Sequence, residues 1–293
     1  MRKIRVIVNP ASGQPKPILH TLNKVFRPLD IDWDLALTKD SGDAESFARL
    51  AAEAGADVVA AYGGDGTVME VARGLFGTGV PLAILPGGTA NLMSVELGIP
   101  KDLQKAVEVA ADPESPVRMV DAGLIGQEYF LLRVGVGFAA EKVKAADREL
   151  KTKYGILAYS IGGLRALRST KKAHYRLTLD GKVQELDGLT CLIDNAGNMG
   201  VSGFDIIPGI SVSDGLLDVI IVEHPSFVAL VEKTARTVRT QQAGKSYRHW
   251  QAREITVETD PPQLVQVDGE IIGETPVSIT VSPGLVGVVT PAG

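Results

Sequence analysis

Short apolar runs alternate with helix-spaced segments over about the first 125 residues, and this alternation limits the fold more than any other feature. The runs Ile4–Val8, Asp57–Tyr62 and Pro81–Leu85 are typical of strands buried in a parallel sheet. Between them, apolar residues recur at helical spacing, after the candidate N-caps Ser41 and Asp43 and again further on. A succession of this kind predicts a doubly wound α/β domain.

Glycines give the ends of the two helical segments. The first segment is expected to end at Gly55 and the second before Gly77, because glycine adopts the left-handed conformation that closes a helix.

The second half of the chain has a different pattern, with short strands and tight turns. The turn pairs Asp180-Gly181, Asp214-Gly215 and Asp268-Gly269 favour an antiparallel sandwich or barrel. We expect an α/β domain over residues 1–130 and a β-sandwich domain over residues 131–293, with the C-terminal tail as a candidate to return to the first domain. The expected strands are His174–Asp180, Leu189–Asp194, Leu217–Val222, Glu254–Thr259, Leu264–Val267 and Val277–Val281.

Composition excludes several classes of protein. The formal net charge of −5 argues against nucleic acid as a partner, because phosphate backbones favour basic surfaces. The single cysteine, Cys191, excludes an internal disulfide framework and is expected in the core. No apolar run approaches the length of a membrane span, and the run Ile4–Val8 is too short for a secretory signal. We therefore expect a cytoplasmic protein whose membrane contact, if any, is peripheral.

Three glycine-rich clusters stand at the carboxyl ends of expected strands: Asn9–Gly13, Gly63–Thr67 and Pro86–Asn91. In open α/β sheets, ligands bind at this edge. Glycine lets backbone N–H groups approach a phosphate closely, and a following helix N-terminus adds a favourable dipole. Thr67 and Thr89 add hydroxyl donors, although both fit a plain N-cap role equally well. Together the clusters predict a phosphate site.

Asp65 is the acidic member of these clusters. A carboxylate beside bound phosphates repels them unless a divalent cation lies between, so Asp65 is a candidate Mg²⁺ contact, with an Asx turn as the alternative. The pattern Gly-x-x-x-x-Gly-Lys-Ser/Thr of a Walker loop does not occur, and no Gly-x-Gly-x-x-Gly follows the first expected strand.

The three clusters, followed by Asp214–Asp218 and Asp268–Glu270, resemble the diacylglycerol kinase catalytic-domain family. The resemblance spans nearly the whole chain and is specific as a set, whereas Gly63–Thr67 alone is shared with NAD kinases and, as a close variant, with phosphofructokinases. It implies a kinase that uses ATP and Mg²⁺ to phosphorylate a lipid hydroxyl. It also implies two domains, with ATP in the cleft between them.

The resemblance also implies roles for individual residues. Glu270 matches the family's general base, although from the sequence alone it is as readily the first residue of a returning hairpin strand. With Asp65 it forms the implied catalytic pair. A structural Mg²⁺ is implied at Ser211, Asp214 and Leu216, two of which contribute main-chain carbonyls. The implied nucleotide-binding positions are Asn9, Pro10, Ala11, Ser12, Gly13, Thr38, Gly63, Gly64, Asp65, Gly66, Thr67, Val68, Met69, Glu70 and Thr89.

The chain departs from the common family pattern in two places. Met69 replaces an asparagine, and Leu92-Met93-Ser94 replaces Asp-Phe-Ala. These departures leave the acceptor open among diacylglycerol, a sphingoid base, phosphatidylglycerol and other hydroxyl-bearing lipids. Two alternatives also stay open: an NAD kinase-like phosphotransferase, and a nucleotide- or lipid-binding sensor without catalysis.

Two amphipathic segments, Tyr154–Leu167 and Ser226–Arg239, interrupt the second half. Both fit helices packed on a sheet with a solvated basic face. The first, which has basic flanks, also fits an interfacial helix on anionic lipid. The expected partners are ATP and a lipid at a membrane surface; the assembly state is open, with a homodimer as one candidate.

Overall fold

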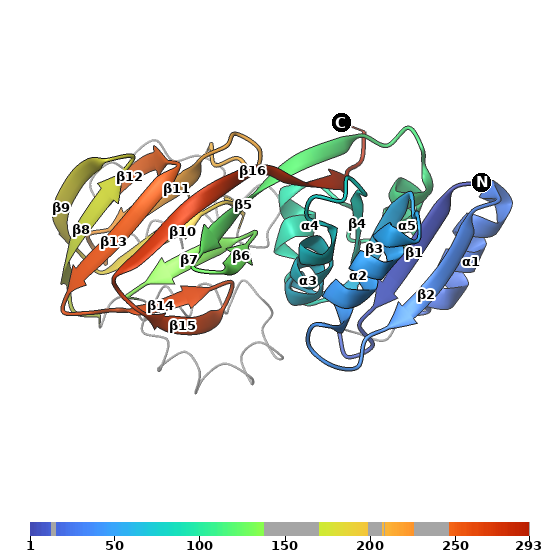
Figure 1. Cartoon of the computed structure of the whole chain (residues 1–293), viewed down its shortest axis with the longest axis horizontal. Helices are drawn as coiled ribbons and strands as arrows, with labels where there is room; N and C mark the ends of the chain where they lie inside the picture. Colours follow the sequence, from blue (N-terminus) through green and yellow to red (C-terminus); the bar gives the residue numbers. More distant parts are fainter. Residues whose placement is uncertain (13–15, 138–169, 199–206, 208, 226–245, 293) are drawn as a thin grey trace. The chain divides into compact units, whose positions relative to one another are not determined.

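The chain folds into two compact units, residues 1–120 with 284–293 and residues 121–283. The computed structural model describes residues 1–12, 16–137, 170–198, 207, 209–225 and 246–292 (Figure 1). The expected amphipathic segments Tyr154–Leu167 and Ser226–Arg239 lie outside the described residues, as does Gly13.

The first unit is built on a parallel sheet of strand order β2-β1-β3-β4, and the last residues of β16 extend it by pairing Val288 and Val289 with β4. Strands β3 and β4 are buried along their whole length, which explains their unbroken apolar runs. Among the described strands of this unit, β2 pairs with β1 alone, and all of its residues are half-buried or exposed. The bounds are β1 (Lys3–Val8), β2 (Asp32–Leu37), β3 (Val58–Gly63) and β4 (Leu82–Pro86).

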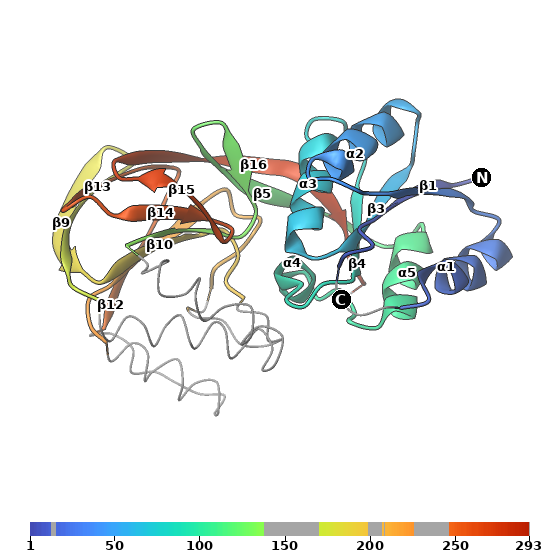
Figure 2. The same cartoon turned by 90° about the horizontal axis from the view of Figure 1, so that it is seen from below.

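Helices cover both faces of this sheet. They are α1 (Ile18–Phe26), the 3₁₀ helix η1 (Arg27–Leu29), α2 (Asp43–Glu53), α3 (Asp65–Leu75), α4 (Leu92–Glu96) and α5 (Leu103–Ala111). Figure 2 shows α2 and α3 on one side of the strands and α1 and α5 on the other. The doubly wound prediction is therefore confirmed. None of the helices in the described ranges is long and apolar enough to cross a membrane.

The ends of α2 correct one expectation and confirm another. Gly42 is the N-cap of α2, with φ of 88°, so neither Ser41 nor Asp43 caps the helix. The Asp43 carboxylate instead accepts hydrogen bonds from the N–H groups of the preceding turn, which hold its pKa below the usual value. At the other end, Gly55 closes α2 at φ of 75°, as expected.

The second unit is an antiparallel β-sandwich. One sheet has the order β12-β11-β10-β7-β14-β15, and the other contains β16-β13-β8-β9. Strands β5 and β16 each contribute residues to both units. The bounds are β5 (Val117–Ile125), β6 (Glu128–Phe130), β7 (Arg133–Val136), β8 (Ala173–Leu179), β9 (Lys182–Gly188), β10 (Thr190–Asp194), β11 (Leu217–Val222), β12 (Tyr247–Ala252), β13 (Glu254–Asp260), β14 (Leu264–Val267), β15 (Glu270–Glu274) and β16 (Val277–Val289).

Two of the three expected Asp-Gly turns close hairpins. Asp180-Gly181 joins β8 to β9, and Asp268-Gly269 joins β14 to β15. Both residues of each pair have positive φ, which is the type I′ geometry that suits twisted strands. Asp214-Gly215 differs, because it lies in the loop before β11 and joins no hairpin.

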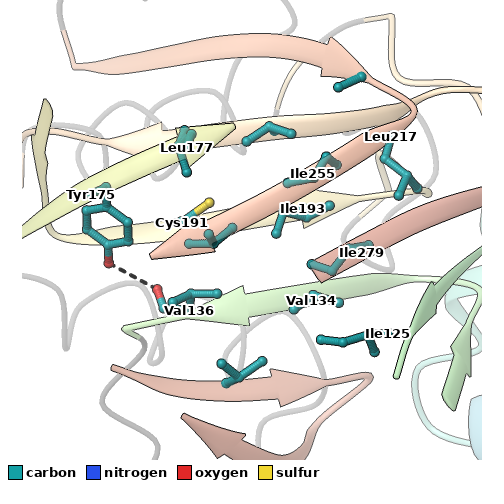
Figure 3. Packing of buried hydrophobic residues seen from close by; sticks show 14 of the residues in the cluster. Ile125, Val134, Val136, Tyr175, Leu177, Cys191, Ile193, Leu217, Ile255 and Ile279 are labelled. Carbon is teal, nitrogen blue, oxygen red and sulfur yellow. Dashed lines mark hydrogen bonds between the residues drawn. The ribbon is translucent and has the colours of Figure 1, made fainter. Parts of the chain in front are cut away.

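Alternate residues of the facing strands fill the sandwich (Figure 3). Tyr175, Leu177 and Ile193 are fully enclosed, and the Tyr175 hydroxyl donates to the Val136 carbonyl at 3.3 Å. Cys191 lies in the same core, as expected, and its burial raises the pKa of the thiol.

The other face of β10 carries a buried acidic pair. Asp194 lies directly opposite Asp218 of β11 and is fully buried, 3.5 Å from the Arg133 guanidinium. His249 Nε2 lies 2.6 Å from Asp218 Oδ1. Burial raises the pKa of Asp194 to about 6, with Asp218 and Asp268 raising it further and Arg133 and His249 opposing the rise.

This shift makes stability depend on pH. An unfolded aspartate has a pKa of about 3.9, so the folded protein holds the Asp194 proton more tightly between that value and about 6. The stabilisation is complete below about pH 4 and is lost as the pH rises to about 6. We expect the free energy of unfolding of the wild type, relative to Asp194→Asn, to fall across this window and then level off. Urea unfolding from pH 4 to pH 8 measures the difference; parallel curves would contradict it.

Candidate functional site

The three glycine-rich clusters meet at one edge of the first sheet. The chain runs from β1 through α1 to β2 on one side, and from β2 through α2 past β1 to β3 on the other side. The switch point of the fold therefore lies between β1 and β3. Asn9 follows β1 there, and its N–H donates to the Tyr62 carbonyl of β3 at 2.9 Å. The carboxyl ends of these strands thus form the edge where doubly wound folds bind ligands.

The Asn9 side chain joins the first cluster to helix α3. Its Nδ2 donates to Thr67 Oγ1 at 3.1 Å, and its Oδ1 accepts from the Ala11 N–H at 3.0 Å. The Ser12 N–H closes the same turn on the Asn9 carbonyl at 3.1 Å. The Asn9–Ser12 turn, which includes Pro10, is therefore shaped before any ligand arrives.

The second cluster forms the start of α3, with Gly64 as its N-cap. Thr67 lies inside the helix, so the N-cap alternative for this residue is wrong. A Cβ on Gly63 would lie 2.4 Å from the Thr67 side chain, so the fold itself requires that glycine. Gly66 is different. It is exposed, and a Cβ there would meet nothing within 4 Å.

Gly66 has an open face, because a side chain there would meet nothing within 4 Å. The backbone of Gly66 is ordinary helix, where glycine is about 1 kcal/mol less favourable than alanine. Neither strain nor crowding within the described chain explains it. An anion held against the first-turn N–H groups of α3 would explain it, because those groups have no partner within the helix.

The third cluster packs directly on the second. The N–H groups of Gly87 and Gly88 both donate to the Gly63 carbonyl, at 2.9 and 3.0 Å. A Cβ on Gly88 would lie 2.5 Å from the Gly64 Cα, so the two loops touch through their backbones.

Asn91 closes this third loop. Its Oδ1 accepts from the Gly88 N–H at 2.9 Å, and its Nδ2 donates to the Gly88 carbonyl at 2.8 Å. Asn91 is the N-cap of α4 and has φ of 52°, so the exposed Thr89 is not an N-cap. The sequence reasoning did not name Asn91 as a site residue, although asparagine is among the few residues that tolerate this conformation.

Asp65 lies where the second and third loops meet. Its Oδ1 accepts from the Met93 N–H of α4 at 3.3 Å, which is a link between helices and not an Asx turn. Burial raises the pKa of Asp65, and backbone N–H groups at the start of α4 oppose the rise. This carboxyl group therefore fixes the relative position of the two glycine loops.

Other expected nucleotide positions have structural contacts. Thr38 follows β2 and donates its N–H to the Val8 carbonyl at 3.0 Å, which places it beside the first cluster. Val68 and Met69 are buried in the core of the unit, so only their backbones are available to a ligand.

Glu70 caps α2, the helix beside its own. Its Oε2 accepts from the N–H groups of Gly42 and Ala44 at 3.0 and 3.3 Å, and its Oε1 lies 3.4 Å from the Ser41 hydroxyl. This contact explains why neither Ser41 nor Asp43 is needed as a cap.

Glu270 belongs to the second unit, where it is the exposed first residue of β15. The turn before it is anchored by the Asp268 carboxylate, which accepts from the N–H groups of Leu131 at 3.3 Å and Arg133 at 2.9 Å. The Gln266 side chain adds a bond to the Gly269 carbonyl at 2.7 Å. The position of Glu270 is thus set by its neighbours.

The expected metal residues lie in the loop before β11. Asp214 Oδ1 accepts from the Leu216 N–H at 3.0 Å, and the Ser211 hydroxyl accepts from the Ser213 N–H at 3.3 Å. Asp121 holds the loop by accepting from the Gly215 N–H at 2.7 Å. No cluster of three or more His, Cys, Asp or Glu occurs in the described ranges, but the expected site needs only one carboxylate.

The charges around this loop fit a divalent cation. Burial raises the pKa of Asp214, and the nearby carboxylates of Asp218 and Asp121 raise it further. A cation beside these groups would relieve their repulsion, and oxygen donors are the ligands that Mg²⁺ prefers.

This fit gives a prediction about stability. Without nucleotide, Mg²⁺ at about 100 times its Kd should stabilise the wild type by about 2.7 kcal/mol and Asp214→Ala much less. Thermal unfolding in EDTA and in Mg²⁺ measures the two shifts. If Mg²⁺ raised the melting temperature of both proteins equally, Asp214 would not be a ligand of the metal.

The fold and the loops define a class: an α/β unit whose glycine loops meet at the carboxyl ends of its strands, followed along the chain by a β-sandwich unit. Comparison with known families agrees with each half. The diacylglycerol kinase catalytic domain matches residues 3–123, and the YegS C-terminal NAD kinase beta sandwich-like domain matches residues 133–290. The chain belongs to the diacylglycerol kinase family of lipid kinases.

Individual relatives span almost the whole chain. A diacylglycerol kinase of Bacillus subtilis is 28% identical over 94% of this chain and 92% of its own length. An uncharacterized protein of Synechocystis is 32% identical over 98% of this chain and 70% of its own length. A crystal structure of a diacylglycerol kinase from Bacillus anthracis matches 99% of this chain and 97% of that chain at 29% identity, with a TM-score of 0.81.

Proposed function

We propose that this protein transfers the γ-phosphate of ATP, in a Mg²⁺-dependent reaction, to the hydroxyl group of diacylglycerol or a related lipid. The observation that carries the proposal is the open face at Gly66, where the fold leaves room for a ligand against the start of α3. Membership of the diacylglycerol kinase family supports phosphoryl transfer to a lipid as the reaction.

In this proposal the glycine loops bind the phosphates through backbone N–H groups and the start of α3. Asp65 would hold the Mg²⁺ of the nucleotide, which supplies stabilisation of the charge that develops on the transferred phosphoryl group. Asp65 also accepts from the Met93 N–H, so in this role its carboxylate would hold the metal while it stays bonded to the start of α4.

Glu270 has the role of general base. The lipid hydroxyl oxygen forms a bond to the γ-phosphorus, the bond from that phosphorus to the β,γ-bridging oxygen breaks, and ADP leaves. Glu270 accepts the hydroxyl proton, and a base in this position typically contributes about 10²–10⁴-fold.

Transfer of label tests the proposal. The purified protein is incubated with γ-labelled ATP and a panel of diacylglycerol, a sphingoid base and phosphatidylglycerol in mixed micelles, with NAD as a further acceptor. We expect label in one lipid, dependent on Mg²⁺. Label in NAD and in no lipid favours the NAD kinase-like alternative, and nucleotide binding without transfer favours a sensor.

Because the acceptor is a lipid, we also propose peripheral contact with a membrane surface. The protein should sediment with vesicles that contain the acceptor lipid. Protein that stays in the supernatant under turnover conditions would contradict this part of the proposal.

A further inference from the structure

Lys16 places a cation beside the meeting glycine loops. It lies two residues before α1, and its Nζ donates to the Pro86 carbonyl at 3.3 Å. Pro86 is the last residue of β4 and directly precedes Gly87 and Gly88, whose N–H groups bind the second loop. The sequence motifs do not predict a role for Lys16, because this residue lies outside all three glycine-rich clusters.

The partner of Lys16 is neutral. Two arginines of the first unit pair with carboxylates, Arg5 with Asp32 at 3.2 Å and Arg49 with Glu45 at 2.9 Å. Lys24, like Lys16, has a neutral partner, the Gln104 side chain. Over the described parts of the chain, the Lys16 ammonium forms no ion pair. Its bond to a carbonyl oxygen is weaker than a bond to an anionic oxygen, and an ammonium group has two further donors.

The loops themselves bring little positive charge to this edge. The N–H groups of Gly87 and Gly88 are already bonded to the Gly63 carbonyl, so the start of α3 supplies the N–H dipoles, and Asp65 brings a carboxyl group. A nucleotide polyphosphate held here needs a compensating cation, and an ammonium group beside the loops supplies one as a point charge.

We propose that Lys16 binds the nucleotide phosphates directly, exchanging the Pro86 carbonyl for a phosphate oxygen. This inference rests on the proposed function, since it assigns a further binding residue to the same site. Lys16 is exposed, so an anion reaches it without any change in the core.

Nucleotide affinity tests the assignment without lipid turnover. Lys16→Met should weaken ADP binding about tenfold to a hundredfold, because hydrogen bonds to charged groups are lost, and should leave adenosine binding unchanged. Lys24→Met is the matched control. It also removes one lysine charge from the first unit, but Lys24 binds Gln104 on α5, away from the loops, so ADP affinity should be kept. Calorimetry measures each dissociation constant.

A second measurement needs no variant. Acetylation of Lys16 in the wild type, followed by mass spectrometry, should be slowed by ADP and not by adenosine. ADP affinity of Lys16→Met within twofold of the wild type, or no protection of Lys16 by ADP, overturns the assignment and leaves the proposed function standing. A wild type that binds no nucleotide overturns both.

Discussion

Glu270→Gln should lower lipid phosphorylation about 10²–10⁴-fold while ADP affinity and stability stay those of the wild type. Glutamine keeps the size of the side chain but cannot accept the proton of the lipid hydroxyl. The loss should therefore appear in kcat, with little change in KM for the lipid.

The structure explains why this change should not disturb the fold. Glu270 is exposed at the start of β15, and the turn before it is held by Asp268 and by the Gln266 side chain. A surface substitution of this kind changes stability by about 0.5 kcal/mol or less.

Glu274→Gln is the matched control, because Glu274 is exposed at the other end of the same strand and carries the same charge. It should keep the wild-type rate. Radiolabel transfer at saturating ATP compares the three proteins. Turnover by Glu270→Gln near that of the wild type would remove the residue from the role of base.

Local patterns in the sequence predicted much of this fold. The apolar runs of β1, β3 and β4 and the Asp-Gly hairpins depend on residues that are neighbours in the chain, so their outcome could be predicted. Strand β2 (Asp32–Leu37) was missed, because with two aspartates in six residues it lacks an unbroken apolar run.

The contacts that shape the site could not be predicted from local sequence patterns, because they join residues far apart in the chain. Asp65 accepts from Met93 and Glu70 from Gly42, each across 28 residues, and nothing near either acid indicates that partner. Sequence patterns therefore located the three glycine-rich loops, whereas the side chains that hold those loops together required the structure.

Gly88→Ala and Gly66→Ala should change stability in opposite directions while both weaken nucleotide binding. A Cβ on Gly88 would lie 2.5 Å from the backbone of Gly64, so the loops must separate. Overpacking of this kind costs about 1–3 kcal/mol. At Gly66 a Cβ meets nothing, and alanine in a helix is favoured over glycine by up to about 1 kcal/mol.

Together, the two variants separate the effect of each glycine on stability from its effect on nucleotide binding. If a phosphate lies against the start of α3, the Gly66→Ala methyl group takes its place and ADP affinity falls by at least about tenfold, although the protein melts at a higher temperature. Thermal unfolding and ADP titration of both variants measure the two effects. A Gly66→Ala protein that binds ADP as tightly as the wild type would mean that this open face does not hold the nucleotide, and the phosphates would then have to lie elsewhere along the edge.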